Sequence, residues 1–276
     1  GAAYYWQNKS PALSFFTGVP YGMTTPELTA WMRYMGGQEI WDEIYDQFGV
    51  QGFLSGNTGT QTGGWFRDEL KSLDDVKGVR FRTPGLGGRV WEKLGATVTN
   101  MAAGEIFQAL QSGTLDAAEF VGPYNDLALG FHQVAKNYYM PSFVESGLAT
   151  ELVVDKKKYQ ELPENLQAII RDVSQAEYDQ VAADFYANDP RALKTLQEEH
   201  GVTVRNFPDD IMEARADEPA APPSTPEPRP SNGPDWDARF QVHPSDQANI
   251  EKPGNWLTYP YPFIYGQVDQ SLFPIA

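Results

Sequence analysis

The sequence predicts an α/β protein in which helices and strands alternate along residues 1–216. Apolar side chains recur at helical spacing within residues 39–48, where Ile40 and Ile44 share one face. Short alternating or β-branched runs, such as residues 79–82, are typical of strands. Glycines end several of the helical segments before the next strand begins. Because parallel strands need helical crossovers, this alternation predicts βα units and a mostly parallel sheet.

Boundary signals place the first helices. Thr24 and Thr25 are N-cap candidates and Pro26 suits a first turn, so a helix is expected over residues 28–35. Apolar spacing predicts the second helix over residues 39–48. Further along, the same signals predict a Gly-rich loop at 56–64, a strand at 79–82, a helix at 89–94 ended by Gly95, a strand at 97–98, a helix at 105–111 ended by Gly113, and a strand at 115–121.

The following segment predicts a buried strand and a long helix. Residues 148–155 are apolar and β-branched, which suits a strand with both faces covered. A helix is expected to begin at Leu162-Pro163-Glu164, with an inner face made of Leu166, Ile169, Ile170 and Val173. Asp189-Pro190 is predicted to break this helix before another that ends at Gly201, followed by a short strand at 202–204.

Residues 217–276 differ in composition from the rest of the chain. Seven prolines fall between Pro219 and Pro234, a density that neither a helix nor a sheet tolerates. Trp256 and the Tyr-Pro repeats at 259–263 follow without a clear period. We therefore expect a Pro-rich linker and an irregular tail in this region.

Composition narrows the classes of function. The formal net charge of −16 and the pI of about 4.5 make nucleic-acid binding unfavourable, because an acidic surface repels phosphate backbones. The chain has no cysteine, which excludes disulfides, thiolate nucleophiles and Cys-ligated zinc. No apolar run approaches the roughly 20 residues of a membrane span.

Catalytic signatures find little support in the sequence. His132, His200 and His243 are its only histidines, and none has a partner at the spacing of a zinc motif. No G-x-S-x-G nucleophile motif occurs. Residues 85–88 follow a strand and open a helix, but they lack the G-x-G-x-x-G and P-loop patterns. They are interpreted as a tight turn that allows close contact between helix and strand.

Arg82 is the first candidate for ligand binding. It lies where a predicted strand ends at a Gly-rich turn, and ligands of open α/β sheets lie beyond the carboxyl ends of strands. A guanidinium can hold a carboxylate through two parallel hydrogen bonds. The alternative is an ordinary surface ion pair.

Further candidates offer oxygen atoms. Glu119 closes the strand at 115–121 beside Phe120, where a carboxylate is costly unless a cation faces it or it turns into solvent. Glu145 lies just before the strand at 148–155, while Asn57 and Gln61 lie in the Gly-rich loop. From the pattern alone, these last residues are either ligands or ordinary loop residues.

Several ordered motifs together resemble one protein family. Taken as a set, they resemble the extracytoplasmic solute-binding proteins of TRAP (tripartite ATP-independent periplasmic) transporters, and the likeness extends over about residues 1–213. The branch most similar to this chain binds 2-oxo acids such as pyruvate, or lactate, with a metal ion. The matching stretches are residues 1–6, 56–66, 79–85, 104–113 and 116–123.

The resemblance implies a role for each candidate residue. Arg82 matches the arginine that clamps the ligand carboxylate, and Gln61 and Glu145 match side chains that coordinate the metal. The pair Glu119-Phe120 matches a Glu-Trp position that contributes to metal and ligand contact, partly through a main-chain carbonyl. Phe120 therefore lacks the indole N–H of that pattern. The last two matches, positions that reach the ligand, are Tyr5 and Asn57.

A cation would reconcile these residues with an anionic ligand. Glu119 and Glu145 near the same anion would repel it unless a positive ion lies between them. Ligands that are all oxygen suit Na⁺ or Ca²⁺ rather than zinc. The sequence leaves open which of the two ions binds and which acid is taken.

The family fold implies two α/β lobes with the ligand in the cleft between them. Lobe I would comprise residues 1–58 and 146–187, and lobe II residues 59–145 and 188–216. The resemblance also implies a periplasmic location, delivery of the acid to the membrane subunits of a TRAP transporter, and a possible homodimer. In this interpretation the protein is a receptor and not an enzyme.

Two departures from the family pattern are expected to matter. The chain is expected to lack a signal peptide and the first βαβ segment, and to diverge from the family after Glu213. The protein is then expected to be poorly stable alone, and the altered tail to weaken a dimer. Two other functions stay open: an enzyme that acts on a 2-oxo or 2-hydroxy acid with Arg82 and the metal, and a tail at 217–276 that serves as an interaction module.

Overall fold

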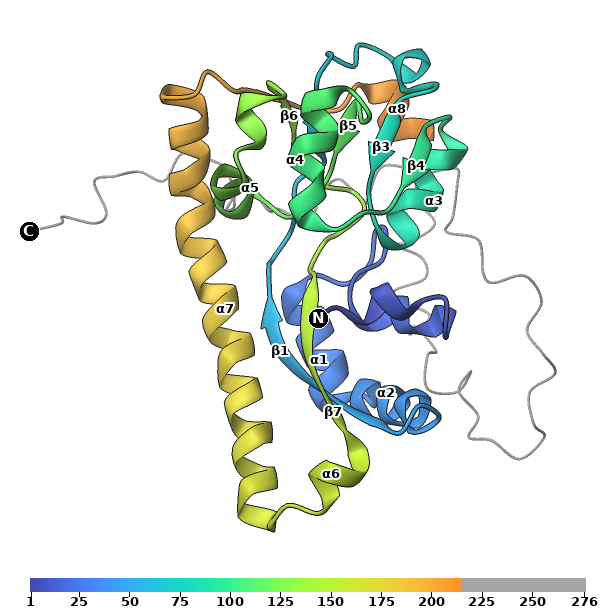
Figure 1. The fold of residues 1–276 in the computed structure, drawn as a ribbon, viewed down its shortest axis with the longest axis vertical. Coiled ribbons are helices and arrows are strands. Elements are labelled where there is room, and N and C mark those ends of the chain that lie inside the picture. Colours follow the sequence, from blue (N-terminus) through green and yellow to red (C-terminus); the bar gives the residue numbers. More distant parts are fainter. Residues whose placement is uncertain (215–276) are drawn as a thin grey trace, which may run out of the picture. The chain divides into compact units, whose positions relative to one another are not determined.

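The computed structural model describes residues 1–214, which contain eight strands in two sheets (Figure 1). The Pro-rich segment and the tail predicted for residues 217–276 lie outside the described residues. In the smaller sheet, β1 (Val50–Asn57) pairs antiparallel with β7 (Ala149–Asp155). The larger sheet has the order β4 (Thr97–Thr99), β3 (Arg80–Arg82), β5 (Ala117–Ala118), β2 (Gly64–Phe66), β6 (Asn137–Tyr139), β8 (Thr203–Arg205).

The larger sheet is mostly parallel, as predicted. The pairs β3–β4, β3–β5 and β6–β8 are parallel, whereas β2 runs antiparallel to both of its neighbours, β5 and β6. Adjacent residues of a strand point to opposite faces. Trp65 and Tyr138 therefore belong to one buried cluster, while Phe66 and Tyr139 belong to the cluster on the other face. Both faces of the sheet are thus covered by apolar side chains.

Helices surround both sheets. They comprise α1 (Thr25–Tyr34), α2 (Gly37–Asp46), α3 (Gly85–Lys93), α4 (Ala103–Ser112), α5 (Pro123–Leu129), α6 (Lys156–Gln160), α7 (Glu164–Glu198) and α8 (Asp209–Ala214), with 3₁₀ helices at Ala3–Trp6, Pro11–Phe16, Leu73–Val76 and Phe131–Gln133. The predicted boundaries near α1 and α3 are confirmed: Thr24 and Glu27 form a capping box, and Gly95 follows the C-cap residue of α3 with a φ of 106°. No helix within residues 1–214 is both long and apolar enough to cross a membrane.

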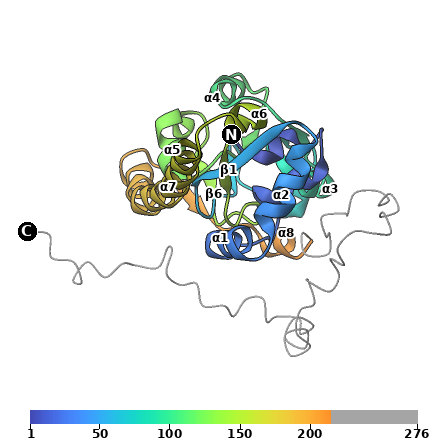
Figure 2. The ribbon, with the colours of Figure 1, turned by 90° about the horizontal axis from the view of Figure 1, so that it is seen from below.

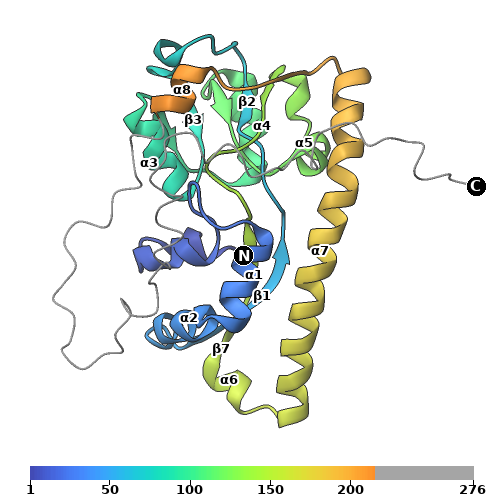
Figure 3. The ribbon, with the colours of Figure 1, turned by 180° about the vertical axis from the view of Figure 1, so that it is seen from behind.

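The strands β1 and β7 and the helix α7 connect the two sheets. In Figures 1 and 3, β1 and β7 lie beside α1 and α2 and lead toward the larger sheet, and α7 runs past both sheets. Viewed from below, α7 and the helices α1 and α2 lie on different sides of β1 (Figure 2). A third buried cluster joins side chains from α1, α2 and α7. Its members include Phe16, Leu28, Trp41 and Tyr178. The residues between β1 and β2 and between β6 and β7 therefore link one sheet to the other.

The predicted break at Asp189-Pro190 is wrong. The helix α7 continues through Pro190 to Glu198. Proline in a helix interior costs about 3 kcal/mol, so packing must compensate. Around the proline, Phe185, Asp189 and Ala192 are buried, and the Asp189 carboxylate accepts a hydrogen bond from the Tyr124 N–H of α5 at 3.0 Å.

The inner face predicted for this helix is also wrong. Leu166 is 41% exposed, and Ile169 and Val173 are each 54% exposed. The buried face begins only at Ser174 and continues through Tyr178 and later residues. The N-terminal turns of α7 therefore carry apolar side chains that stay partly exposed in the part of the chain that the structure describes, whereas α7 as a whole packs mainly on β1 and α5.

Several strands were not predicted, and one was predicted too buried. The strands β1, β2 and β6 are short or rich in glycine, so they lack the β-branched runs that mark strands. Gly52 in β1 is needed because a Cβ there would lie 2.7 Å from the Tyr45 ring. The strand β7 is confirmed, but Leu152 and Val153 are exposed because no second layer covers them within the described residues.

Candidate functional site

Arg82 and Glu119 lie side by side at the carboxyl ends of two parallel strands. In the register of β3 and β5, Arg82 is opposite Ala118, and the Glu119 N–H donates to the Arg82 carbonyl at 2.8 Å. The Arg82 guanidinium donates from Nη1 to the Glu119 carbonyl at 2.5 Å and from Nε to the Met101 carbonyl at 3.3 Å. These two hydrogen bonds use two of the five N–H groups of the guanidinium. The guanidinium is thus held in place with donors left over for a ligand.

Gln61 and Glu145 come from the two segments that join the sheets. The Gln61 N–H donates to the Glu145 carbonyl at 3.1 Å, and the Ser142 N–H donates to the Gln61 carbonyl at 3.1 Å. The Thr58 N–H donates to the Leu148 carbonyl at 2.9 Å, and the Thr60 hydroxyl donates to the Ser146 carbonyl at 2.7 Å. These bonds tie the two segments, which we call the crossing unit (residues 58–61 and 142–148), to each other.

Three buried oxygen atoms in this region lack a hydrogen-bond partner among the described residues. They are Oε1 of Gln61, Oε1 of Glu119 and Oε2 of Glu145. Each of these side chains is at most 3% exposed, so water does not reach them freely. A buried polar atom without a partner is costly, so several such atoms in one region are typical of a site for a positive or hydrogen-bonding ligand.

Burial and mutual repulsion disfavour two negative charges here. Burial raises the pKa of Glu119 to about 8; Arg82 opposes this shift and the charge of Asp126 adds to it. Burial, followed by the charge of Glu119, also raises the pKa of Glu145 well above its usual range. The Nη1 atom of Arg82 lies 3.9 Å from Oε2 of Glu119, so the site has one buried cation for two buried carboxyl groups. An additional cation would offset the excess negative charge.

The residues present fit a hard cation. Gln61, Glu119 and Glu145 would contribute an amide oxygen and two carboxylates, a donor set that suits Na⁺ or Ca²⁺. Within residues 1–214 no group of three or more Asp, Glu, His or Cys side chains is arranged to hold a metal. A cation site at this place would therefore need the amide of Gln61 in addition to the two carboxyl groups.

Phe120 and Asn57 have different surroundings. The Phe120 ring lies 5.6 Å from the Arg82 guanidinium carbon and packs edge-on against Phe131, so it flanks the arginine. The Asn57 side chain is fully buried and already bonded within the fold. Its amide oxygen accepts from the Thr25 hydroxyl at 2.7 Å, and its amide nitrogen donates to the Tyr178 hydroxyl at 3.0 Å. Asn57 thus ties β1 to α1 and α7.

Tyr4 is buried near the carboxyl groups, and the predicted ligand residue Tyr5 lies beside it. Tyr5 is 48% exposed, whereas the buried Tyr4 packs against Gly85, where a Cβ would lie 2.6 Å from its ring. Burial and then the charge of Glu145 raise the pKa of the Tyr4 hydroxyl well above its usual value. The centroids of the two tyrosine rings lie 4.7 Å apart, and Tyr5 is also among the groups that raise the pKa of Tyr4.

Asp126 is a buried carboxyl group that the sequence reasoning missed. It lies in the first turn of α5, where an acidic residue is usually interpreted as an exposed group that interacts with the helix dipole. In the structure it is fully buried, and burial raises its pKa to about 7. No signal in the local sequence separates these two placements.

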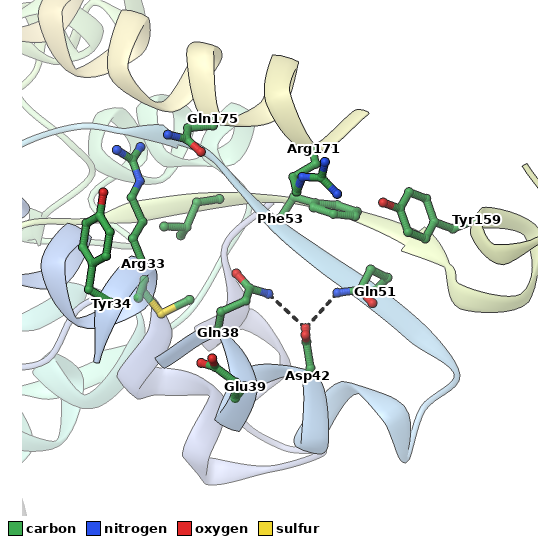
Figure 4. A pocket seen from close by; sticks show the side chains of 12 residues that line it. Arg33, Tyr34, Gln38, Glu39, Asp42, Gln51, Phe53, Tyr159, Arg171 and Gln175 are labelled. Atoms are coloured by element: carbon green, nitrogen blue, oxygen red, sulfur yellow. Dashed lines mark hydrogen bonds between the residues drawn. The ribbon is translucent and has the colours of Figure 1, made fainter. Parts of the chain in front are cut away.

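A separate groove of about 520 Å³ lies away from these residues, between α1, α2, β1 and α7 (Figure 4). Among its polar lining groups, Gln38 and Gln51 both donate to Asp42, at 2.9 and 2.7 Å. Arg33, which also lines it, pairs with Asp179 at 3.0 Å. None of the buried oxygen atoms without a hydrogen-bond partner within residues 1–214 belongs to a residue that lines this groove.

Cation affinity is expected to fall in acid. Below about pH 8 the cation-free Glu119 holds a proton that a cation must displace, so affinity should fall about tenfold per pH unit for each proton released. The stability of the cation-free protein should change in the opposite sense. Because the folded pKa is raised, the contribution of Glu119 is present in acid and is lost as the pH rises through about 8. Calorimetric Ca²⁺ titrations across this range would check both, and a pH-independent affinity would contradict the assignment.

One family model matches most of the chain. It is described as "Bacterial extracellular solute-binding protein, family 7" and matches residues 1–219. Among curated proteins, the monocarboxylate 2-oxoacid-binding periplasmic protein of Nostoc sp. (strain PCC 7120) is 43% identical over 170 residues, which cover 62% of this chain and 47% of that protein. The chain therefore spans about half the length of this curated relative.

Two solved structures are similarly close. A TRAP periplasmic solute-binding protein from Pseudoalteromonas atlantica was crystallised with bound sodium and pyruvate. Its relative from Colwellia psychrerythraea was crystallised with bound calcium and pyruvate. Each is 41% identical with a TM-score of 0.75, over 78% of this chain and 66% of the other. The two-lobed α/β architecture expected from the sequence is therefore confirmed.

Proposed function

This chain belongs to family 7 of the bacterial extracellular solute-binding proteins, and from that premise we propose that it captures a small monocarboxylate together with a cation. The acid would be a 2-oxo acid such as pyruvate, or lactate. The cation would be Na⁺ or Ca²⁺. The observation that carries the proposal is the group of three buried, unpaired oxygen atoms beside a buried arginine.

Each residue takes a part that follows from its chemistry. Arg82 offers hydrogen-bond donors to the carboxylate of the acid. Gln61, Glu119 and Glu145 would hold the cation, which supplies positive charge next to the keto or hydroxyl oxygen of the acid. Phe120 would cover the apolar part of the ligand. Asn57 would keep β1 in place beside α1 and α7, and the Tyr4 hydroxyl would lie next to the carboxyl groups.

The two sheets would belong to two lobes that move against each other. Residues 1–58 and 146–187 would form one lobe, and residues 59–145 and 188–216 the other. A ligand that contacts both lobes stabilises the closed form by its greater affinity for that form. The closed receptor would then deliver its acid in the periplasm to the membrane subunits of a TRAP transporter.

Calorimetry with a panel of acids tests this proposal. The full chain, dialysed against a chelator, should bind pyruvate or lactate when Ca²⁺ or Na⁺ is present and more weakly when both are absent. After incubation, nuclear magnetic resonance should detect the same acid unchanged, because a receptor performs no chemistry on its ligand. Binding that ignores the cation would contradict the proposal, and conversion of the acid would favour an enzyme.

A further inference from the structure

Asp126 accepts three hydrogen bonds although it is fully buried and forms no ion pair within residues 1–214. Its Oδ2 accepts from the Trp65 indole N–H at 2.9 Å and from the Tyr138 hydroxyl at 2.8 Å. Its Oδ1 accepts from the Val121 N–H at 3.4 Å. A buried carboxyl group without a counterion is costly, so three donors aimed at it indicate a specific arrangement.

These bonds connect the segments that carry two of the candidate cation ligands. Val121 is two residues after Glu119. The Tyr138 hydroxyl is also 3.0 Å from the hydroxyl of Thr62, which is the residue after Gln61. In addition, the Thr62 N–H donates to the Val121 carbonyl at 3.0 Å. Asp126, Tyr138, Thr62 and Val121 thus form a closed ring of hydrogen bonds behind Gln61 and Glu119.

We propose that Asp126 is a positioning residue that sets the separation of Gln61 and Glu119 for the bound cation. This inference rests on the proposed function only in taking these two side chains as cation ligands. Asp126 does not touch the cation itself. It holds the Val121 main chain on one side and, through Tyr138, the Thr62 side chain on the other. Substituting a residue that orients metal ligands in this way typically weakens metal affinity 10–100-fold.

Asp189 provides a matched control. It is also a buried acid that contacts α5, and burial raises the pKa of Asp189 to about 6, as it raises the pKa of Asp126 to about 7. Its carboxylate accepts from the Tyr124 N–H at the start of α5. Unlike Asp126, it makes no hydrogen bond, among residues 1–214, to the segments that carry Gln61 and Glu119. It does lie near them, since a Cβ on Gly122 would be 3.2 Å from its Oδ1, and its charge is among the causes that raise the pKa of Asp126. A loss caused merely by disturbing α5 should therefore appear in both variants.

The experiment compares Asp126→Asn with Asp189→Asn in the full chain. Calorimetric titration with Ca²⁺ alone, without any acid, should show an affinity at least about tenfold weaker in Asp126→Asn and within about twofold of wild type in Asp189→Asn. Competition with Na⁺ measures the preference between the two ions, which a general loss of stability would not change. The preference for Ca²⁺ over Na⁺ should change only in Asp126→Asn, because only that variant alters the spacing of the ligands.

Thr62→Val keeps the test open if Asp126→Asn does not fold. This substitution retains the shape of the side chain but removes the hydroxyl that bonds to Tyr138. It should also weaken Ca²⁺ binding, and in the double variant the two losses should not add, because both break one ring. Thermal unfolding of each cation-free variant measures stability separately from affinity.

The Ca²⁺ affinities of these variants decide whether Asp126 positions the cation ligands. Equal affinities in Asp126→Asn and Asp189→Asn, or an unchanged affinity in Thr62→Val, would overturn this inference. Wild-type protein that binds Ca²⁺ but no monocarboxylate would overturn the proposed function, while the Ca²⁺ affinities of the variants would still decide the role of Asp126. Wild-type protein that binds neither Ca²⁺ nor Na⁺ would overturn both.

Discussion

Replacing Arg82 with alanine is expected to weaken pyruvate binding at least about tenfold, because a hydrogen bond to a charged group contributes about 1.5–3 kcal/mol. The ligand carboxylate would also enter a buried region that holds two acidic side chains and no remaining arginine beside them. Arg82→Lys should recover only part of the affinity, since an ammonium keeps the charge but not the planar pair of donors. Calorimetry at saturating Ca²⁺ measures both variants.

Arg80→Ala is the matched control for this prediction. Arg80 lies on the same strand but is half-exposed and forms a bidentate pair with Asp116 at the surface. Pyruvate affinity should be unchanged in this variant. Because Arg82 also holds the Glu119 and Met101 carbonyls, thermal unfolding must accompany the binding data. A folded Arg82→Ala protein with wild-type affinity would refute the carboxylate clamp.

Glu145→Gln is expected to have effects of opposite sign on stability with and without cation. The cation-free protein should become more stable near neutral pH, because burial, and then the charge of Glu119, raises the pKa of Glu145 well above its usual range. The wild-type carboxyl group must therefore take up a proton on folding, whereas the amide need not. The stabilisation by Ca²⁺ should disappear; for comparison, a ligand at 100 times its Kd stabilises the folded state by about 2.7 kcal/mol. Thermal unfolding with a chelator and with excess Ca²⁺ measures both effects.

Glu151→Gln controls for the loss of a buried carboxyl group elsewhere. Glu151 on β7 is 5% exposed and accepts a hydrogen bond from the Tyr45 hydroxyl at 2.5 Å, away from the candidate site. This variant should retain the full Ca²⁺ response. If Glu145→Gln responded to Ca²⁺ as strongly as Glu151→Gln, Glu145 would not be a cation ligand.

Local sequence signals placed one half of the candidate site. A strand that ends at a Gly-rich turn located Arg82, and the strand predicted at 115–121 located Glu119. The two residues meet because β3 and β5 are parallel neighbours, whose carboxyl ends point the same way. The pairing of Gln61 with Glu145 could not be derived from local patterns. It depends on main-chain bonds between segments more than 80 positions apart, and only the family resemblance indicated it.

The errors have physical causes. Proline normally ends a helix, but the contacts of Phe185, Asp189 and Ala192 keep α7 continuous. The apolar stripe at Leu166 and Ile169 has helical spacing, yet it remains exposed, since periodicity predicts a helix but not what covers it. The burial of Asp126 depends on donors from β2 and β6, which the sequence near α5 does not contain.

The hydrogen bonds within the crossing unit have a consequence for how the protein responds to its surroundings. They connect the main chains of Gln61 and Glu145, whereas Arg82 and Glu119 lie at the carboxyl ends of β3 and β5. A cation bound by Gln61, Glu145 and Glu119 would link these segments. The acid would then bind to contacts that are already in place. We therefore expect the protein to retain a monocarboxylate only when the cation is present at the same time.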